Sequence, residues 1–136
     1  MSSHTARVRV RYAETDQMGV VYHANYIVWM EVGRVELCRA RGIAYKEIEQ
    51  QAGIRLAVIE ASCRYVAPAR YDDEVDVETS IVKASPRGVE FGYVMRHAES
   101  GQLLAEGRTR HLFLGHDLRP TKLPAEFHSQ FAIAGQ

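Results

Sequence analysis

Two kinds of hydrophobic pattern occur along the chain, and the first is the period-two pattern of strands. Residues 7–12 alternate charged and apolar side chains, which predicts a strand with Val8, Val10 and Tyr12 on one face. Four later segments also have strand character, and turn-forming residues separate them. These segments are residues 54–66, 74–84, 89–97 and 103–114. The pattern therefore predicts one N-terminal strand and four consecutive antiparallel strands.

Helical patterns occupy the chain between the first strand and the other four. A long helix is predicted to begin near residues 24–25 and to end near Arg41, with Gly42 as its C-terminal stop. A short helix is predicted over residues 45–52, where Gly53 ends it. One strand, a long helix and four antiparallel strands predict an α+β domain.

The long helix is apolar on two sides. At about 100° per residue, one apolar stripe consists of Tyr26, Trp29, Met30, Gly33, Leu37 and Ala40, and the other of Val28, Val32, Val35 and Cys38. A helix with two apolar sides is expected to be buried on both, so we expect the sheet to curl around it. Gly33 costs roughly 1 kcal/mol of helix propensity, and we expect close approach of another backbone there.

Composition is that of one globular domain. The chain has 136 residues, so residues 1–136 are predicted to form a single domain. Apolar residues make up 46% and charged residues 25%, a balance that excludes the disordered class. After residue 118, Pro120 and Pro124 predict a tail on the surface.

Charge and cysteine usage remove several classes of function. Lys plus Arg and Asp plus Glu number 17 each, so the chain lacks the net positive field that favours nucleic-acid binding, although a local basic patch stays compatible with this total. Cys38 and Cys63 form no CxxC pair and the histidines have no ligand spacing, so we expect no disulfide framework and no metal site. No secretory signal and no membrane span are predicted, which favours a cytoplasmic protein.

Candidate chemistry concentrates in residues 12–26, just before and at the start of the long helix. A helix N-terminus presents unpaired N–H groups and the positive end of the dipole, so it would stabilise an oxyanion on a carbonyl. Asp16 could act on that carbonyl as a nucleophile or general base. The structural alternative is that Asp16 is a loop or capping residue and His23 is a half-buried histidine at the helix start.

The same run resembles the signature of a known family. Its motif reads Tyr12-x-x-Thr15-Asp16-x-x-Gly19-Val20-Val21-Tyr22-His23-x-Asn25-Tyr26, and a second block covers residues 65–74. Both resemble the 4-hydroxybenzoyl-CoA thioesterase family, in the branch that includes acyl-CoA thioesterases associated with the Tol–Pal system. The likeness spans about residues 7–124. It implies a hot-dog fold, in which a five-stranded antiparallel sheet wraps around one long central helix.

The resemblance also implies an activity, the hydrolysis of an acyl-CoA thioester to a free acid and CoA without a cofactor. Asp16 would be the catalytic carboxylate, attacking the carbonyl or activating water, and the His23 backbone N–H would polarise the carbonyl. Tyr12 and the His23 side chain would orient Asp16 or line the pocket. The implied substrate-binding positions are Gly19, Val21, Tyr22, Asn25, Tyr26 and Arg87. Benzoyl-type members carry Tyr-Pro where this chain has His23-Ala24, so an aromatic acyl group is not implied.

Two further groups of residues have a functional and a structural interpretation. Glu31 could serve as a helix-borne catalytic carboxylate, whereas an i,i+3 ion pair with Arg34 is the structural reading and the one we favour. Lys83, Arg87 and Gly88 lie at a predicted turn. The family often meets the CoA nucleotide there, and an exposed basic turn is the alternative.

Two rival functions and one assembly complete the predictions. A hydroxyacyl-thioester dehydratase would use His23 with Glu31, and a non-catalytic acyl-CoA-binding domain would bind without turnover. A five-stranded sheet leaves exposed edges that invite pairing with a second copy. The family forms dimers by joining sheets and often tetramers, with active sites at the dimer interface. The acyl group, and the choice between CoA and acyl-carrier-protein thioesters, are left open by the sequence.

Overall fold

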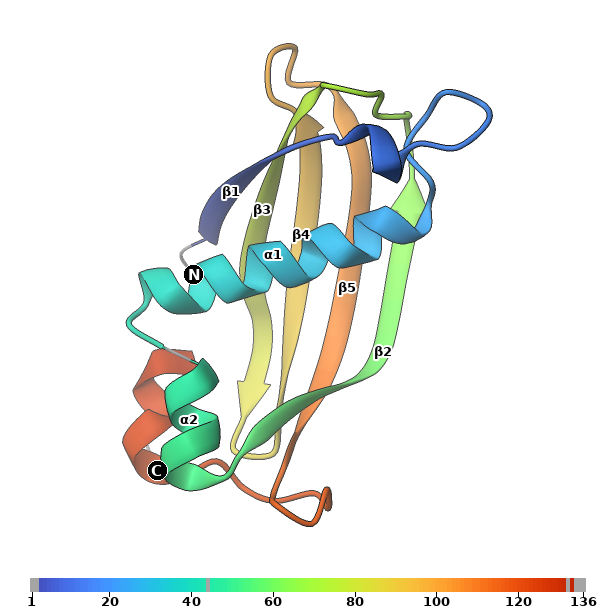
Figure 1. The fold of residues 1–136 in the computed structure, drawn as a ribbon. Helices are drawn as coiled ribbons and strands as arrows, with labels where there is room; N and C mark the ends of the chain where they lie inside the picture. The colour runs from blue at the N-terminus through green and yellow to red at the C-terminus, as the bar shows by residue number, and fades with distance from the viewer. Residues whose placement is uncertain (1–2, 44, 132, 134–136) are drawn as a thin grey trace.

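The computed structural model describes residues 3–43, 45–131 and 133. Figure 1 shows a long helix packed across one face of a sheet, with a second helix beside its C-terminal end. The elements are β1 (Ser3–Arg9), α1 (Ala24–Ala40), α2 (Tyr45–Ala52), β2 (Arg55–Tyr65), β3 (Glu74–Ser85), β4 (Gly88–His97) and β5 (Leu103–Leu114), with 3-10 turns η1 (Tyr12–Glu14) and η2 (Ala125–Phe131). This is the predicted α+β hot-dog architecture.

The sheet has the order β1-β3-β4-β5-β2, and every neighbouring pair is antiparallel. Strands β1 and β2 therefore form its two edges. The β1–β3 register pairs Arg9 with Glu74, and the β2–β5 register pairs Leu56 with Phe113. Because β1 ends where β3 begins, the loop that follows β1 leaves the sheet at the Glu74 end of β3.

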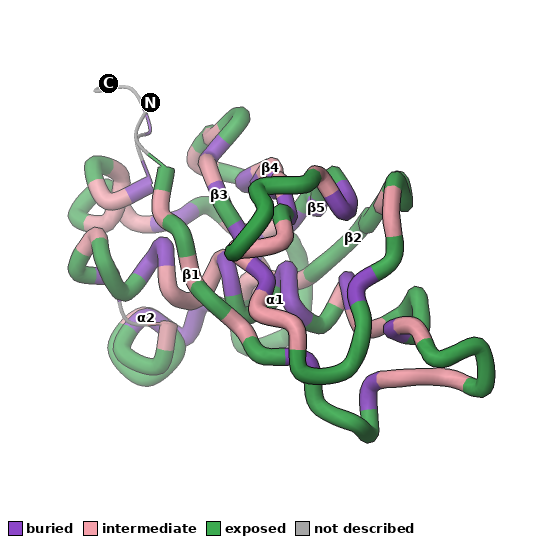
Figure 2. Tube along the Cα trace, turned by 90° about the horizontal axis from the view of Figure 1, so that it is seen from above, coloured by how far each residue is buried: buried purple, intermediate pink, exposed green. Residues whose placement is uncertain are grey.

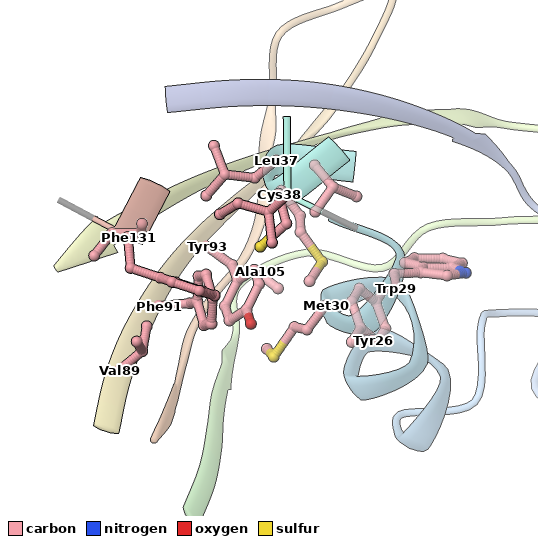
Figure 3. Packing of buried hydrophobic residues seen from close by; sticks show 14 of the residues in the cluster. Tyr26, Trp29, Met30, Leu37, Cys38, Val89, Phe91, Tyr93, Ala105 and Phe131 are labelled. Atoms are coloured by element: carbon pink, nitrogen blue, oxygen red, sulfur yellow. The ribbon is translucent and has the colours of Figure 1, made fainter. Parts of the chain in front are cut away.

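The core lies between α1 and the sheet. Figure 2 shows buried positions where α1 faces the strands, and Figure 3 shows α1 side chains meeting Phe91 and Tyr93 of β4. The Gly33 prediction is confirmed in part. A Cβ atom at that position would overlap the Thr79 side chain and lie 2.9 Å from a Val77 methyl group, so β3 does approach α1 closely. Side chains of β3, rather than its backbone, make the approach.

Two-sided burial of α1 is wrong for the single chain. Its first stripe is buried through Tyr26, Trp29, Met30, Gly33 and Leu37. In the second stripe only Cys38 is buried, whereas Val28 is 49% exposed and Val32 is 36% exposed. The physical reason is that one five-stranded sheet covers one side of a helix. The second stripe needs another surface to cover it.

Two boundary predictions are corrected. The first strand ends at Arg9 rather than Tyr12, because the Val10 N–H donates to Asp73 O and the chain then enters η1. The C-terminal tail is not only surface chain. Leu123, Phe131 and Ile133 are 2%, 0% and 6% exposed, because their apolar side chains belong to the hydrophobic core. Figure 1 shows the C-terminal η2 segment beside α2.

Candidate active site

The loop between β1 and α1 is a compact, internally bonded structure. Thr15 and Val21 form an isolated antiparallel bridge, and the Asp16 N–H donates to Val20 O at 2.9 Å. Gly19 has a φ of 81°, a conformation that favours glycine, and its N–H donates to Asp16 O at 3.0 Å. These bonds turn the chain sharply and bring Asp16 back towards the start of α1.

Asp16 lines a groove of about 390 Å³. One oxygen, Oδ1, accepts the Met18 N–H at 2.8 Å. Among the described residues, no donor bonds to the other oxygen. The groove is lined by Asp16, Met18, Val20, Val21, His23, Tyr26 and residues 65–68. Asp16 therefore has a carboxylate oxygen available to a molecule in this groove.

His23 lies at the N-terminal cap of α1, on the same groove. Within the described residues, its backbone N–H has no acceptor, as expected at a helix start. Its carbonyl oxygen accepts the Tyr65 hydroxyl at 2.9 Å. The Tyr65 bond holds the first turn of α1 against the end of β2, so the free N–H has a fixed place beside Asp16's groove.

Tyr26 and Val21 form the floor of the groove. Both are buried, and the Ala69 backbone ties them together: the Val21 N–H donates to Ala69 O at 2.9 Å, and the Ala69 N–H donates to the Tyr26 hydroxyl at 3.1 Å. Burial raises the pKa of Tyr26, and the Ala69 N–H opposes that rise. The residue 65–69 segment is thus part of the site. The second motif block was the sequence signal for this segment. Reasoning from the sequence took that block as evidence of the fold and missed its place in the site.

Five predicted site residues lie outside the groove lining, and four of them belong to the Asp16 loop or the start of α1. Tyr12 is 77% exposed and its ring contacts Tyr71 edge-on at a centroid distance of 5.6 Å. Gly19 shapes the loop, and Tyr22 is half-exposed with its ring 4.5 Å from that of His23. Asn25 donates from Nδ2 to Glu14 O at 2.9 Å. The single chain therefore brings Asp16, Val21, His23 and Tyr26 together, and it uses Asn25 to hold the loop.

Arg87 lies in the turn between β3 and β4, and Asp16 in the loop between β1 and α1. Figure 1 shows that this turn and this loop are at opposite ends of the sheet. The Asp16 loop follows the Arg9–Glu74 pair, whereas Arg87 follows the other end of the 12-residue strand β3. At roughly 3.3 Å per residue, β3 separates them by about 40 Å. Lys83, Arg87 and Gly88 line a separate hollow of about 270 Å³. One chain does not combine these residues with Asp16.

Glu31 and Arg34 do not form the ion pair that we favoured. Among the described residues, no ion pair joins them, although both line a cavity of about 160 Å³ between α1, α2 and β2. Burial, and then the Arg34 charge, lower the pKa of His111 to about 4. His23 and Glu31 lie eight positions apart, about 12 Å along α1, and they line different cavities. The residue pair of the dehydratase hypothesis is therefore separated within one chain.

Sequence reasoning missed Glu14, a buried carboxylate that bonds to Trp29. A lone Glu in a loop gives no sequence signal of burial. Within the described ranges, no group of three His, Cys, Asp or Glu side chains is placed to hold a metal ion. Cys38 is buried in the core and Cys63 is half-buried. In the described part of the chain, every helix is too short or too polar to cross a bilayer.

Comparison with known proteins gives a consistent relationship. Residues 10–131 match the model of the thioesterase-like superfamily. The chain is 38% identical over 105 residues to the putative acyl-CoA thioesterase YneP of Bacillus subtilis, covering 77% of this chain and 75% of YneP. Its structure resembles the DHNA-CoA thioesterase of Staphylococcus aureus, with a TM-score of 0.92 at 31% identity over 97% of this chain and 90% of that one.

The fold is shared more widely than the sequence. The structure of a 4-hydroxybenzoyl-CoA thioesterase variant superposes with a TM-score of 0.87 at 20% identity, covering 96% of this chain and 99% of that one. At this identity the likeness concerns the fold. The family match covers nearly all of the described chain, including the Asp16 loop, α1 and the whole sheet except β1. The chain belongs to the thioesterase-like superfamily.

Proposed function

We propose that this thioester hydrolase cleaves acyl-CoA thioesters at the groove between the Asp16 loop and the start of α1. The observation that carries the proposal is the convergence of two groups on one groove: a carboxylate oxygen of Asp16 without a donor among the described residues, and the N–H of His23 without an acceptor among them. One group supplies an attacking or proton-accepting oxygen. The other supplies a donor for a carbonyl oxygen.

Two routes follow from this arrangement, and both use Asp16. In the first, an Asp16 oxygen attacks the thioester carbonyl carbon, the C–S bond breaks with its electron pair on sulfur, and water hydrolyses the resulting anhydride. In the second, Asp16 takes a proton from a water that attacks the same carbon, and the intermediate then expels the thiolate. In both routes the His23 N–H and the helix dipole stabilise the negative charge on the carbonyl oxygen.

The names of the relatives support a CoA thioester as the substrate. YneP is a putative acyl-CoA thioesterase, and the Staphylococcus aureus protein is a DHNA-CoA thioesterase. Tyr26 and Tyr65 supply aromatic walls to the groove, and their rings meet edge-on at 5.2 Å. Tyr12, Gly19, Tyr22 and Asn25 stay in the proposal as residues that shape the loop or meet the substrate at its rim.

We also propose that two copies assemble by antiparallel pairing of their β2 edge strands. On β2, Val58 and Ile59 are each 50% exposed, and on α1 the stripe of Val28 and Val32 is uncovered. Exposed apolar side chains beside an unpaired edge are the features that a second copy would cover. Such a pairing would cover the second stripe of α1, as the sequence pattern of the helix predicts. It would also give the dimer that the family resemblance implies.

Antiparallel pairing also supports a role for Arg87. The Phe113 N–H donates to Arg87 O at 3.0 Å, and Phe113 pairs with Leu56, so Arg87 lies towards the Arg55 end of β2. When two β2 strands pair antiparallel, the Arg55 end of one lies beside the Tyr65 end of the other. Arg87 of the partner subunit would then approach the groove of Asp16 and could meet the CoA phosphates.

Thiol release separates the proposal from its rivals. The wild-type chain is incubated with hexanoyl-, palmitoyl-, benzoyl- and 3-hydroxyacyl-CoA, and free thiol and acyl products are measured. We expect free CoA and the matching acid from at least one thioester. An enoyl-CoA product without free thiol would support the dehydratase, and binding of every thioester without turnover would support the non-catalytic domain.

The assembly has its own test. Ile59→Lys places a charge on the β2 edge, and Leu118→Lys places one on a 60% exposed leucine outside β2 and the groove lining. Sedimentation of the wild type distinguishes a dimer from a dimer of dimers. We expect Ile59→Lys to give folded monomers with little activity and Leu118→Lys to behave as the wild type. A stable, fully active wild-type monomer would contradict the proposed assembly.

A further inference from the structure

Glu14 is a buried carboxylate at the centre of the loop that carries Asp16. It is 5% exposed, and it is the single acidic side chain in the buried class within the described residues. Burying a carboxylate is costly unless hydrogen-bond donors surround it. A buried carboxylate in this position therefore needs donors from neighbouring residues. The contacts of Glu14 show which parts of the chain supply them.

Donors from both sides of the loop meet the Glu14 carboxylate. Its Oε1 accepts the Arg11 N–H at 2.8 Å, and its Oε2 accepts the Trp29 indole N–H at 3.1 Å. Burial alone would raise the pKa of Glu14. The Arg11 N–H, the Trp29 N–H and the Arg11 guanidinium outweigh burial, so the pKa lies below its ordinary value. Glu14 is therefore ionised at neutral pH.

Trp29 anchors this bond in the core. It is 2% exposed, on the second turn of α1, and packs edge-on against Tyr26 at 5.0 Å. In Figure 3 Trp29 lies at the margin of the labelled cluster, and its indole nitrogen points away from the other labelled side chains. The indole N–H is thus presented to the loop by a side chain that the core holds rigidly.

The backbone of Glu14 makes a second set of bonds. Its carbonyl oxygen accepts the Tyr22 N–H at 2.8 Å and the Asn25 Nδ2 group at 2.9 Å. Glu14 therefore joins residues before the loop, after the loop and on the first two turns of α1. Asp16 lies two residues further on, and His23 follows Tyr22 directly. Both members of the proposed reacting pair depend on this one junction.

We propose that Glu14 and Trp29 are positioning residues for hydrolysis: their hydrogen bond sets the separation of the Asp16 carboxylate from the His23 N–H. This rests on the proposed function of the groove. The bond controls turnover by placing a reacting oxygen, since a misplacement of about 1 Å can reduce a rate roughly 100-fold. Neither side chain lines the groove, so substrate affinity does not depend on them directly.

The first test separates kcat from KM. Glu14→Gln keeps the shape of the side chain but removes its charge. It also places an amide NH₂ group against either the Arg11 N–H or the Trp29 N–H, where two donors cannot bond. Trp29→Phe keeps an aromatic ring and removes the indole N–H. We expect each to lower kcat roughly 10–100-fold with KM little changed, measured well below the melting temperature on the best CoA thioester of the panel. A rise in KM of the same size with kcat unchanged would overturn the proposal.

A matched control removes general destabilisation as the cause. Thr109 is also buried, and its hydroxyl bonds to Tyr93 Oη at 2.6 Å and to His111 Nε2 at 2.8 Å. Thr109→Val breaks a buried polar network of similar size away from the loop. We expect it to lower the melting temperature while kcat stays at the wild-type value. If kcat falls as much in Thr109→Val as in Glu14→Gln, Glu14 has no specific positioning role.

Two further measurements test whether the residues act as one unit. In the Glu14→Gln/Trp29→Phe double variant, kcat is expected to fall no further than in the more impaired single variant, and additive losses would contradict the shared bond. Trp29 is the only tryptophan in the chain, so its fluorescence reports on the contact directly. Glu14→Gln should change the Trp29 emission, whereas Thr109→Val should leave it unchanged.

Asp16→Asn in the same series separates this proposal from the proposed function. If Asp16→Asn is inactive and Glu14→Gln turns over normally, the positioning role alone is wrong. If Asp16→Asn turns over normally, the assignment of the groove is wrong. The combination that supports both proposals is an inactive Asp16→Asn and slow Glu14→Gln and Trp29→Phe with near-normal KM.

Discussion

The two ends of α1 use polar residues in opposite ways. At its N-terminal end Asp16 and His23 line an open groove, and the His23 N–H and one Asp16 oxygen have no partners among the described residues. Beyond the middle of α1, the Tyr93 and Thr109 hydroxyls and His111 Nε2 bond to one another inside the core, while His111 Nδ1 is buried without a hydrogen-bond partner among the described residues. Figure 3 shows Tyr93 among the buried side chains that pack against the helix. Open donors and acceptors can meet a substrate. The network of Tyr93, Thr109 and His111, here called the closed network because the core covers it, is part of the packing.

The comparison also shows what a shifted pKa indicates here. The pKa of His111 is lowered to about 4, and burial strongly raises that of Tyr45; both lie towards the C-terminal half of α1. Burial is the first cause in each case, and structural networks perturb pKa values as active sites do. The candidate site is proposed from two unpartnered groups whose residues line one groove, and not from the size of a pKa shift.

The largest effect in the closed network should be its dependence on pH. His111 has a folded pKa of about 4 against an ordinary 6.5. The unfolded chain therefore binds a proton between these values that the folded chain does not, so stability falls as the pH drops from 6.5 to 4. The difference amounts to about 3 kcal/mol. Chemical unfolding at several pH values should show this loss in the wild type and not in His111→Gln.

Equal losses in the wild type and in His111→Gln would mean that His111 does not carry the acid sensitivity. Glu14 also makes stability depend on pH, in the lower part of the same pH range. Its pKa is lowered in the folded state, so its contribution is present above the ordinary glutamate pKa of 4.5 and is lost as the pH falls further. Subtracting the His111→Gln curve from that of the wild type removes this shared contribution.

A smaller effect is expected where α1 crosses β3. A methyl group at Gly33 would overlap the Thr79 side chain, so Gly33→Ala should destabilise the fold by about 2 kcal/mol despite its better helix propensity. Thr79 Oγ1 has no hydrogen-bond partner among the described residues. Thr79→Ala should therefore remove the closer of the two clashes at little cost and restore part of the melting temperature lost in Gly33→Ala, because the Val77 methyl group still lies 2.9 Å from the added carbon. Failure of this rescue would show that the Val77 methyl group, rather than Thr79, limits the approach.

The smallest effect concerns Thr109. Thr109→Val leaves the Tyr93 hydroxyl and His111 Nε2 without their shared partner, so we expect a loss of about 1–2 kcal/mol. Turnover per folded molecule should not change. A fall in kcat in this variant would show that the closed network is coupled to the groove. The two ends of α1 would then not differ in the way described above.

Local patterns predicted most of the fold. The short helix over 45–52 and the strand over 103–114 agree with the structure at both ends, because Gly53 has a φ of 65° that stops the helix and Ser100-Gly101 forms the turn before the strand. The exposed Val28 and Val32 show the limit of such patterns. A stripe of valines predicts burial but does not say whether the covering surface belongs to the same chain.

The candidate site was predicted in part. Asp16 and His23 were proposed from a carboxylate before a helix N-terminus, and the structure has both residues lining one groove. Their roles came from the family resemblance and stay predictions. Glu14 and Tyr65 were not assigned to the site, because their contacts join residues 15 and 42 positions apart that no local pattern connects. Arg87 is a long-range case of another kind, since its place beside Asp16 requires a second copy. Its role stays a prediction until the assembly is measured.

The central claim is that Asp16 performs the chemistry in the groove. Asp117 offers a matched control: like Asp16, it accepts the N–H of the residue two positions on, here Arg119 at 3.1 Å, and it lies outside the groove lining. Asp16→Asn and Asp117→Asn should both fold and lose at most about 0.5–1 kcal/mol of stability, so neither melting temperature should change greatly.

Turnover of a CoA thioester by these two variants is the most direct measurement. We expect Asp16→Asn to lose about 10²–10⁴-fold in kcat while still binding the substrate, and Asp117→Asn to hydrolyse it at the wild-type rate. Near-normal hydrolysis by folded Asp16→Asn would contradict the account.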